Sequence, residues 1–169
     1  QKQRERDPSM GYARDFIGAI ESVLPAITER GVKVIANAGG VNPPACADAV
    51  RALIPAGASK EKLRIAVVTG DDLLGRLDAL MASGHALANM ETGAPLSSIR
   101  DSVLSANAYI GSAPIVEGLA RGANVVITGL STDTALTMAP IRHEFGWGDS
   151  DWATLASGII ARSEARRVG

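Results

Sequence analysis

The stretch Val32-Lys-Val-Ile-Ala-Asn-Ala-Gly-Gly-Val-Asn-Pro-Pro-Ala-Cys46 joins an apolar run to an amphipathic helix. Val32–Ala36 has the pattern of a buried strand. The Gly39-Gly40 pair frees the backbone for a tight or left-handed turn, and the prolines after it suit the first turn of a helix. Open α/β sheets build ligand loops in this way at the carboxyl end of a strand. The stretch therefore predicts an α/β protein with a ligand loop after its first strand.

Three further runs have the pattern of strands, and each is followed by a turn and a helical segment: Arg64–Thr69, Val103–Ile110 and Asn124–Thr128. Aromatic residues make up only 4% of the chain, so the core must consist of Val, Ile, Leu and Ala, as in helices packed on parallel strands. We predict a three-layer, Rossmann-like α/β fold, with a mainly parallel sheet of about four strands and helices on both faces.

Local signals predict the segments around this sheet. Asp7-Pro8 has the composition of a helix start, with Asp at the cap and Pro at the first helical position. Glycines and a proline in and around Ser83–Ser98 predict a long loop over the carboxyl edge of the sheet. Asp151 is expected to cap the last helix, which would turn three side chains inward: Trp152, Leu155 and Ile159.

Composition predicts one domain, residues 7–160, with tails at 1–6 and 161–169. Without residues 1–6 and 162–169 the chain has 11 basic and 16 acidic side chains, which argues against a nucleic-acid groove. No apolar run is long enough for a transmembrane helix, and the first residues do not resemble a signal peptide. A single cysteine, Cys46, excludes an internal disulfide and indicates a reducing compartment. We therefore expect a cytoplasmic protein without a membrane partner.

The carboxyl ends of parallel strands meet at one edge of the sheet, so the turns after the four predicted strands should form one pocket. Helix N-termini there favour an anion, so a phosphate or an acyl carboxylate is the expected ligand group. The simpler interpretation of the glycine pair is turn geometry. The predicted ligand-binding residues are Asn37, Gly39, Gly40, Asn42, Thr69, Gly70, Asn107, Tyr109, Thr128, Gly129 and Asp133.

Three side chains are candidates for acid or base catalysis at this edge: Asp71, Asp72 and His85. Asp72 is also well placed to cap the helix that follows, and Asp133, in the fourth turn, is open to the same interpretation. The other two reactive side chains have structural interpretations. Cys46 lies on the apolar face of a helix, and His143 lies in the last turn of a helix, where an imidazole favours the carbonyl ends.

Several catalytic motifs are absent from the sequence. It contains no G-x-x-x-x-G-K-[ST], no G-x-S-x-G and no H-E-x-x-H, and its first strand-to-helix turn is not G-x-G-x-x-G. A P-loop ATPase, an α/β-hydrolase and a zinc protease of the H-E-x-x-H type are therefore disfavoured, and a conventional NAD-binding domain is weakened. No motif requires a metal or a cofactor.

Six separated blocks resemble the acyclic terpene utilisation protein family, in the amino-terminal region of its members: Asp7–Phe16, Asn37–Pro43, Val68–Asp72, Ser105–Gly111, Ile127–Gly129 and His143–Trp147. The resemblance runs from about Asp7 to Ile160. Family members are longer on both sides, so we expect the chain to be a fragment whose partner is the rest of the family domain or a second subunit. Leu130 stands where the family usually has Arg, so the resemblance does not supply a cationic anion ligand at that turn.

The resemblance implies a bacterial protein of acyclic terpene catabolism, the breakdown of compounds such as citronellol and geraniol through coenzyme A thioesters. It supplies neither a reaction nor catalytic residues. Our first hypothesis is an enzyme domain that acts on an acyl-CoA or another small-molecule intermediate of terpene or branched-acid breakdown. The alternatives are a non-catalytic binding or scaffold module of the same pathway and a nucleotide-binding oxidoreductase domain.

Overall fold

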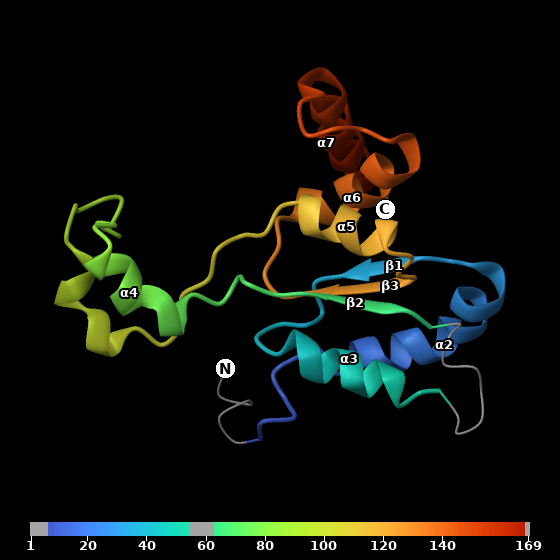
Figure 1. The fold of residues 1–169 in the computed structure, drawn as a ribbon, viewed down its shortest axis with the longest axis horizontal. Coiled ribbons are helices and arrows are strands. Elements are labelled where there is room, and N and C mark those ends of the chain that lie inside the picture. Colours follow the sequence, from blue (N-terminus) through green and yellow to red (C-terminus); the bar gives the residue numbers. More distant parts are fainter. Residues whose placement is uncertain (1–6, 55–62, 168–169) are drawn as a thin grey trace.

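The structure, a computed structural model, describes the backbone of residues 7–54 and 63–167 and the side chains of 7–54 and 63–160. The tail predicted at residues 1–6 lies outside the described residues. Figure 1 shows the helices and strands: α2 (Asp15–Arg30), β1 (Val34–Ala36), α3 (Pro43–Arg51), β2 (Ile65–Val68), α4 (Leu77–Ala82), α5 (Ala113–Ala120), β3 (Val125–Thr128), α6 (Asp133–Phe145) and α7 (Trp152–Arg167). Short 3-10 helices are η2 (Leu74–Arg76), η3 (Leu96–Ser98) and η4 (Arg100–Ser102).

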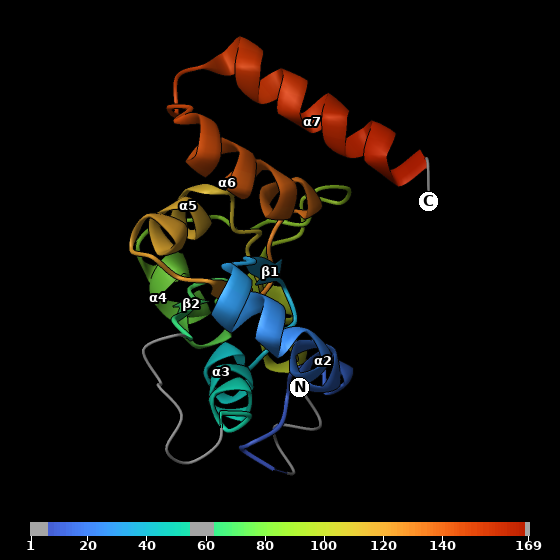
Figure 2. The same cartoon turned by 90° about the vertical axis from the view of Figure 1, so that its right-hand side faces the viewer.

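The sheet has three parallel strands in the order β1-β3-β2. Successive side chains of the central strand β3 point to opposite faces, so Val125 and Ile127 pack in the core beneath α2 and α3. Val126 packs on the other face with residues of α5 and α6, such as Ile115 and Ala139. Figures 1 and 2 show these helices on either side of the sheet. The predicted α/β fold, with a parallel sheet between two helical layers, is confirmed.

The described residues contain three strands rather than about four, because Val103–Ile110 does not form one. This run makes only isolated bridges, an antiparallel one between Asp72 and Asn107 and a parallel one between Ile110 and Ser131. Its residues are largely exposed, so no burial stabilises a full ladder. The strand order also differs from that of a Rossmann half, in which consecutive strands lie side by side.

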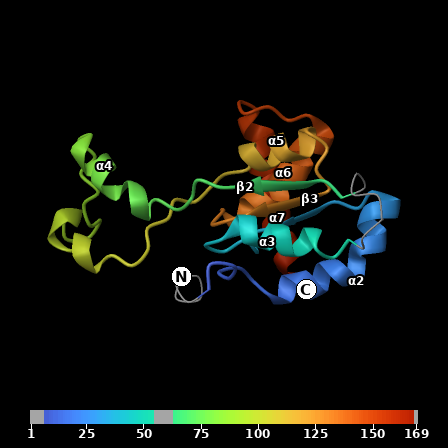
Figure 3. The ribbon, with the colours of Figure 1, turned by 60° about the horizontal axis from the view of Figure 1, so that its bottom comes forward.

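The loop predicted over the carboxyl edge is part of an arm, residues 73–106, that projects away from the sheet (Figures 1 and 3). Its base is closed by the Leu73 amide, which donates to the Ala106 carbonyl at 2.8 Å. Within the arm Leu77 is buried, and the Arg100 guanidinium makes two hydrogen bonds with the Asp78 carboxylate. The loop does not cover the edge because its two limbs leave the sheet together.

The first helix begins at Asp15 rather than at Asp7-Pro8. The Asp7 carboxylate instead accepts hydrogen bonds from the amide and hydroxyl of Ser9, and Gly11 has a φ of 110° that a helix cannot include. The segment before α2 packs against the loop after β1, where the Val41 amide donates to the Gly11 carbonyl at 2.9 Å. These contacts with the loop take the place of the predicted first helical turns.

Of the three residues of α7 predicted to face inward, Leu155 is half-buried and the other two are exposed. Trp152 is 74% exposed and Ile159 is 49% exposed. The buried residue is Gly158, whose missing side chain makes room for the Met138 sulfur; a Cβ there would come within 2.4 Å of that atom. The contact with α6 therefore uses a small residue in place of large ones, and α7 runs on to Arg167.

None of the described helices is long and apolar enough to cross a membrane.

Candidate functional site

The loop between β1 and α3 is shaped by close backbone packing at both of its glycines. The Gly39 amide donates to the Thr128 carbonyl at 3.1 Å, and a Cβ on Gly39 would lie 2.6 Å from that oxygen. Gly40 has a φ of 53°, and a Cβ there would lie 2.5 Å from the Gly11 carbonyl oxygen. The glycine pair thus serves turn geometry and contact between loops, which is the simpler of the two interpretations offered by the sequence.

Asn42 holds the segment that precedes α2. Its Nδ2 donates to the carbonyls of Pro8 and Met10, both at 2.8 Å. Both donor hydrogens of this amide are therefore used within the protein. Asn37, in contrast, is exposed at the start of the same loop, which leaves its amide open to a ligand.

Asp71 is the buried acid of the carboxyl edge, with 4% of its surface exposed. Its Oδ2 accepts hydrogen bonds from the Leu130 amide at 2.8 Å and from Nδ2 of Asn107 at 3.1 Å. Its backbone carbonyl accepts from the Ala108 amide at 2.8 Å. Asp71 thereby joins the end of β2, the base of the arm and the loop after β3. Its Oδ1 takes no hydrogen bond from the described residues.

Gly129 permits this arrangement. A Cβ at Gly129 would lie 2.3 Å from Oδ1 and 2.5 Å from Oδ2 of Asp71. The carboxylate therefore sits directly against the backbone of the loop after β3, in space that any other residue would fill.

Two hollows of about 210 Å³ each adjoin at this edge and share Gly40 and Val41. We call the first the switch hollow; its lining is Asn37, Gly40, Val41, Asn107, Gly129 and Leu130. We call the second the acidic hollow; its lining is Gly40, Val41, Asn42, Pro43, Pro44, Thr69, Gly70, Asp71 and Asp72. Four apolar lining residues were not predicted to belong to the site, because apolar side chains carry no chemical signal: Val41, Pro43, Pro44 and Leu130.

The switch hollow lies where the chain leaves neighbouring strands in opposite directions. Helix α3, after β1, packs on the face formed by Val125 and Ile127, whereas α6, after β3, packs on the face of Val126. The loops after these adjacent parallel strands therefore diverge and leave a crevice between them. Open α/β sheets bind their ligands in such a crevice at the carboxyl ends of the strands.

Other predicted residues lie outside both hollows. Gly39 and Thr128 are buried beneath them, and the Thr128 hydroxyl donates to the Gly129 carbonyl at 2.9 Å. Tyr109 is 69% exposed. Asp133 lies in the first turn of α6, whose N-cap position is held by Thr132.

The candidate acids and bases separate in the same way. Asp72 lines the acidic hollow, and its Oδ1 accepts a hydrogen bond from the Leu74 amide at 3.0 Å. It does not hold the predicted cap position, because Leu73 is the N-cap of η2 and Arg76 is that of α4. His85 is exposed on the arm, away from the sheet edge. The Cys46 side chain is fully buried, and this burial raises the pKa of its thiol to about 11, which agrees with a core residue rather than a nucleophile.

A larger hollow of about 470 Å³ lies along the free edge of β2 beside α5. Its lining contains none of the predicted site residues: Arg64, Ile65, Ala66, Val67, Val68, Pro114, Glu117, Gly118, Arg121 and Ala123. It is the open side of an edge strand, and volume alone does not make it the better ligand site. The carboxyl edge carries the polar groups that a ligand site needs.

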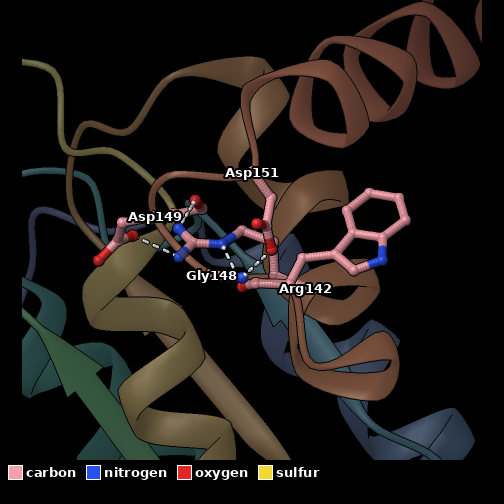
Figure 4. A network of polar contacts seen from close by, with 6 residues as sticks. Arg142, Gly148, Asp149 and Asp151 are labelled. Atoms are coloured by element: carbon pink, nitrogen blue, oxygen red, sulfur yellow. Dashed lines mark hydrogen bonds and ion pairs between the residues drawn. The ribbon is translucent and has the colours of Figure 1, made fainter.

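A buried arginine network at the end of α6 was not predicted from the sequence (Figure 4). Arg142 is 9% exposed; its Nη1 donates to the Ser112 hydroxyl at 2.9 Å and its Nη2 pairs with the Asp149 carboxylate. The Gly148 amide donates to the Asp151 carboxylate at 2.7 Å beside it. A signal existed, because Arg142 follows Ala135 at a spacing of seven on the buried face of α6. The network joins the start of α5 to the turn before α7.

The described residues contain no group of three or more His, Cys, Asp or Glu side chains that could hold a metal ion.

The model of the family described as Acyclic terpene utilisation family protein AtuA matches residues 1–162 of the 169-residue chain. No curated protein and no solved structure is significantly similar to the chain. The family match includes every residue that lines the two hollows.

Proposed function

The chain belongs to the acyclic terpene utilisation family, and we propose that it is an enzyme domain whose substrate binds in the switch hollow and reaches the adjoining acidic hollow, which Asp71 lines. The observation that carries the proposal is the position of this hollow, between loops that diverge from the adjacent strands β1 and β3. A hydrocarbon chain would contact Val41 and Leu130. The amides of Asn37 and Asn107 would bind the oxygen atom of the substrate.

Asp71 is the residue we propose as general base. It is buried, one of its oxygens is held by two hydrogen bonds, and the other takes none from the described residues. A carboxylate that is oriented by one oxygen and free at the other can accept a proton from a bound substrate. Asp72 and His85 are weaker candidates, since Oδ1 of Asp72 already accepts the Leu74 amide and His85 lies on the arm.

The substrate class follows from the family and from the apolar part of the lining. We propose a branched intermediate of citronellol- or geraniol-type breakdown, including its acyl-CoA stage, in the cytoplasm of a bacterium. Either the rest of the family domain or a second subunit would complete the walls of the hollow.

The test combines binding and flux. Amide shifts are mapped during titration with citronellol, and flux through the pathway is followed for Asn37→Ala and Asp71→Asn. We expect shifts in the loops after β1 and β3 and a loss of flux in both variants. Asp133→Asn, at the same edge but outside both hollows, should keep full flux. Shifts confined to the opposite edge of the sheet would refute the proposed site.

One observation favours the second candidate, a scaffold module that holds another protein of the pathway. The arm exposes large apolar side chains, namely Met90 (101%), Ile99 (58%) and Leu104 (73%). A triple change of these residues to Ser should abolish flux if the arm holds a partner, while Asp71→Asn should then have no effect. The enzyme proposal predicts the reverse.

A further inference from the structure

We propose that the group bound between the two hollows is an uncharged hydroxyl, so that the ligand is a branched alcohol or a hydroxyacyl ester rather than a free acid. This inference rests on the proposed function, since it names the chemistry recognised at the same site. It departs from the anionic ligand predicted from the sequence.

The charge of the lining argues against an anion. Among the described residues, no Lys, Arg or His lines either hollow, and the acidic hollow contains both Asp71 and Asp72. The Asp71 carboxylate also contacts three residues of the switch hollow, namely Asn107, Gly129 and Leu130. A ligand carboxylate placed there would face a like charge without a cation between them.

The helix after β1 does not compensate for this charge. Pro43 and Pro44 occupy its first two positions, and neither has an amide hydrogen. The Cys46 amide donates to the Asn42 carbonyl at 3.2 Å. The amino end of α3 therefore offers an anion fewer donors than an ordinary helix does.

The hydrogen-bonding groups that remain suit a hydroxyl. Oδ1 of Asp71 is an acceptor that takes no hydrogen bond from the described residues. A hydroxyl can donate to it, whereas an ether or a simple ester cannot. The Asn37 amide can donate to the hydroxyl oxygen in return. An alcohol is thus bound through both its hydrogen and its oxygen, while Val41 and Leu130 contact its hydrocarbon part.

Three matched probes test this inference on the full chain: citronellol, its methyl ether and citronellate, each titrated at neutral pH. Citronellol should bind at least about tenfold more tightly than either of the others, because each lacks the donor and citronellate adds a repelled charge. Asp71→Asn should weaken citronellol binding by about tenfold and reduce its advantage over citronellate. Leu130→Lys places a cation in the switch hollow and should raise citronellate affinity by about tenfold.

The outcomes separate this inference from the proposed function. If the ether or citronellate binds in the switch hollow as tightly as citronellol, the hydroxyl inference is overturned while the ligand site stands. If none of the three shifts an amide at this edge, the site itself is refuted. Backbone amide spectra of both variants show whether the fold is intact, and Leu130→Lys provides a second measurement should Asp71→Asn fail to fold.

Discussion

Gly129→Ala tests whether the Asp71 carboxylate is held against the loop after β3. The new Cβ would lie 2.3 Å from Oδ1 and 2.5 Å from Oδ2, whereas ordinary contacts begin at 3.4 Å. The carboxylate must therefore move by about 1 Å. Its hydrogen bond to the Leu130 amide, now 2.8 Å, would lengthen beyond the useful range.

The cost can be worked out from these contacts. Two hydrogen bonds to a charged oxygen are lost, those from the Leu130 amide and the Asn107 side chain. Each is worth about 1.5–3 kcal/mol, and partial exposure of the displaced carboxylate to water recovers some of this. We expect Gly129→Ala to lower the free energy of unfolding by about 3 kcal/mol, a large part of the stability of a small domain.

Urea unfolding of four proteins checks this value: the parent chain, Gly129→Ala, Asp71→Ala and the double variant. In the Asp71→Ala background the clash is gone, so Gly129→Ala should cost less than about 1 kcal/mol. Gly18→Ala is the matched control, because a Cβ at this position in α2 meets nothing within 4 Å; it should stabilise the protein by up to about 1 kcal/mol. A cost for Gly129→Ala that is the same in both backgrounds would refute the reasoning.

Three further predictions concern residues that do not contact Gly129 or Asp71. Burial raises the pKa of the Cys46 thiol from 9.0 to about 11, so between these pH values the folded chain keeps a proton that the unfolded chain has lost. The free energy of unfolding should therefore fall between pH 9 and 11. Urea unfolding of Cys46→Ala should show a smaller fall over the same range. Arg142→Met should cost about 2–4 kcal/mol, against less than about 0.5 kcal/mol for the exposed Arg121→Met; equal costs would contradict the buried network. Asn42→Ala removes two hydrogen bonds to backbone carbonyls and should lower the free energy of unfolding by about 1–2 kcal/mol, with faster hydrogen exchange at the Val41 amide. Unchanged exchange would show that the loop keeps its structure without the Asn42 side chain.

The central part of the fold could be predicted because its signals are local. Val32–Ala36 and Asn124–Thr128 are dense in β-branched residues, and β1 and β3 lie within them. Two helices, α2 and α6, end at the glycines Gly31 and Gly146, both in the left-handed conformation. Here apolar pattern and turn chemistry point to the same structure, which is the condition under which such predictions succeed.

The incorrect predictions concern segments whose structure is determined by tertiary contacts. Asp7-Pro8 has a helix-start composition, but the carbonyls near it are used by the loop after β1. Val103–Ile110 alternates weakly, yet its first four residues belong to the arm, and only Ile110 at its end packs against the cluster around Val126. The inward face of α7 was misjudged because the pattern favours large side chains, whereas Gly158 allows the closer approach. None of these contacts can be predicted from the local sequence.

The position of the candidate site could be predicted, but the chemistry at it could not. Parallel strands bring their carboxyl ends together whatever their order, so Asn37 and Gly129 were placed at one edge without knowledge of the sheet. Asn107 reaches the same edge through an isolated bridge with Asp72, although the strand predicted there does not form. Whether the site favours an anion depends on details that the sequence leaves open. One is that no described cationic residue lines the hollows, and another is that hydrogen bonds within the protein already occupy Asn42.

The structural role of Asp71 does not exclude a role in binding, because its two oxygens are used differently. Oδ2 receives both hydrogen bonds from the protein, and these fix the plane of the carboxylate. Oδ1 is therefore held in a fixed direction and takes no hydrogen bond from the described residues. An acceptor fixed in this way loses little side-chain freedom when a donor arrives, so part of the entropic cost of binding is already met in the folded protein. If Asp71 served only to hold the loops together, hydrogen bonds to both of its oxygens would stabilise the fold more than hydrogen bonds to one. The described residues donate to Oδ2 alone.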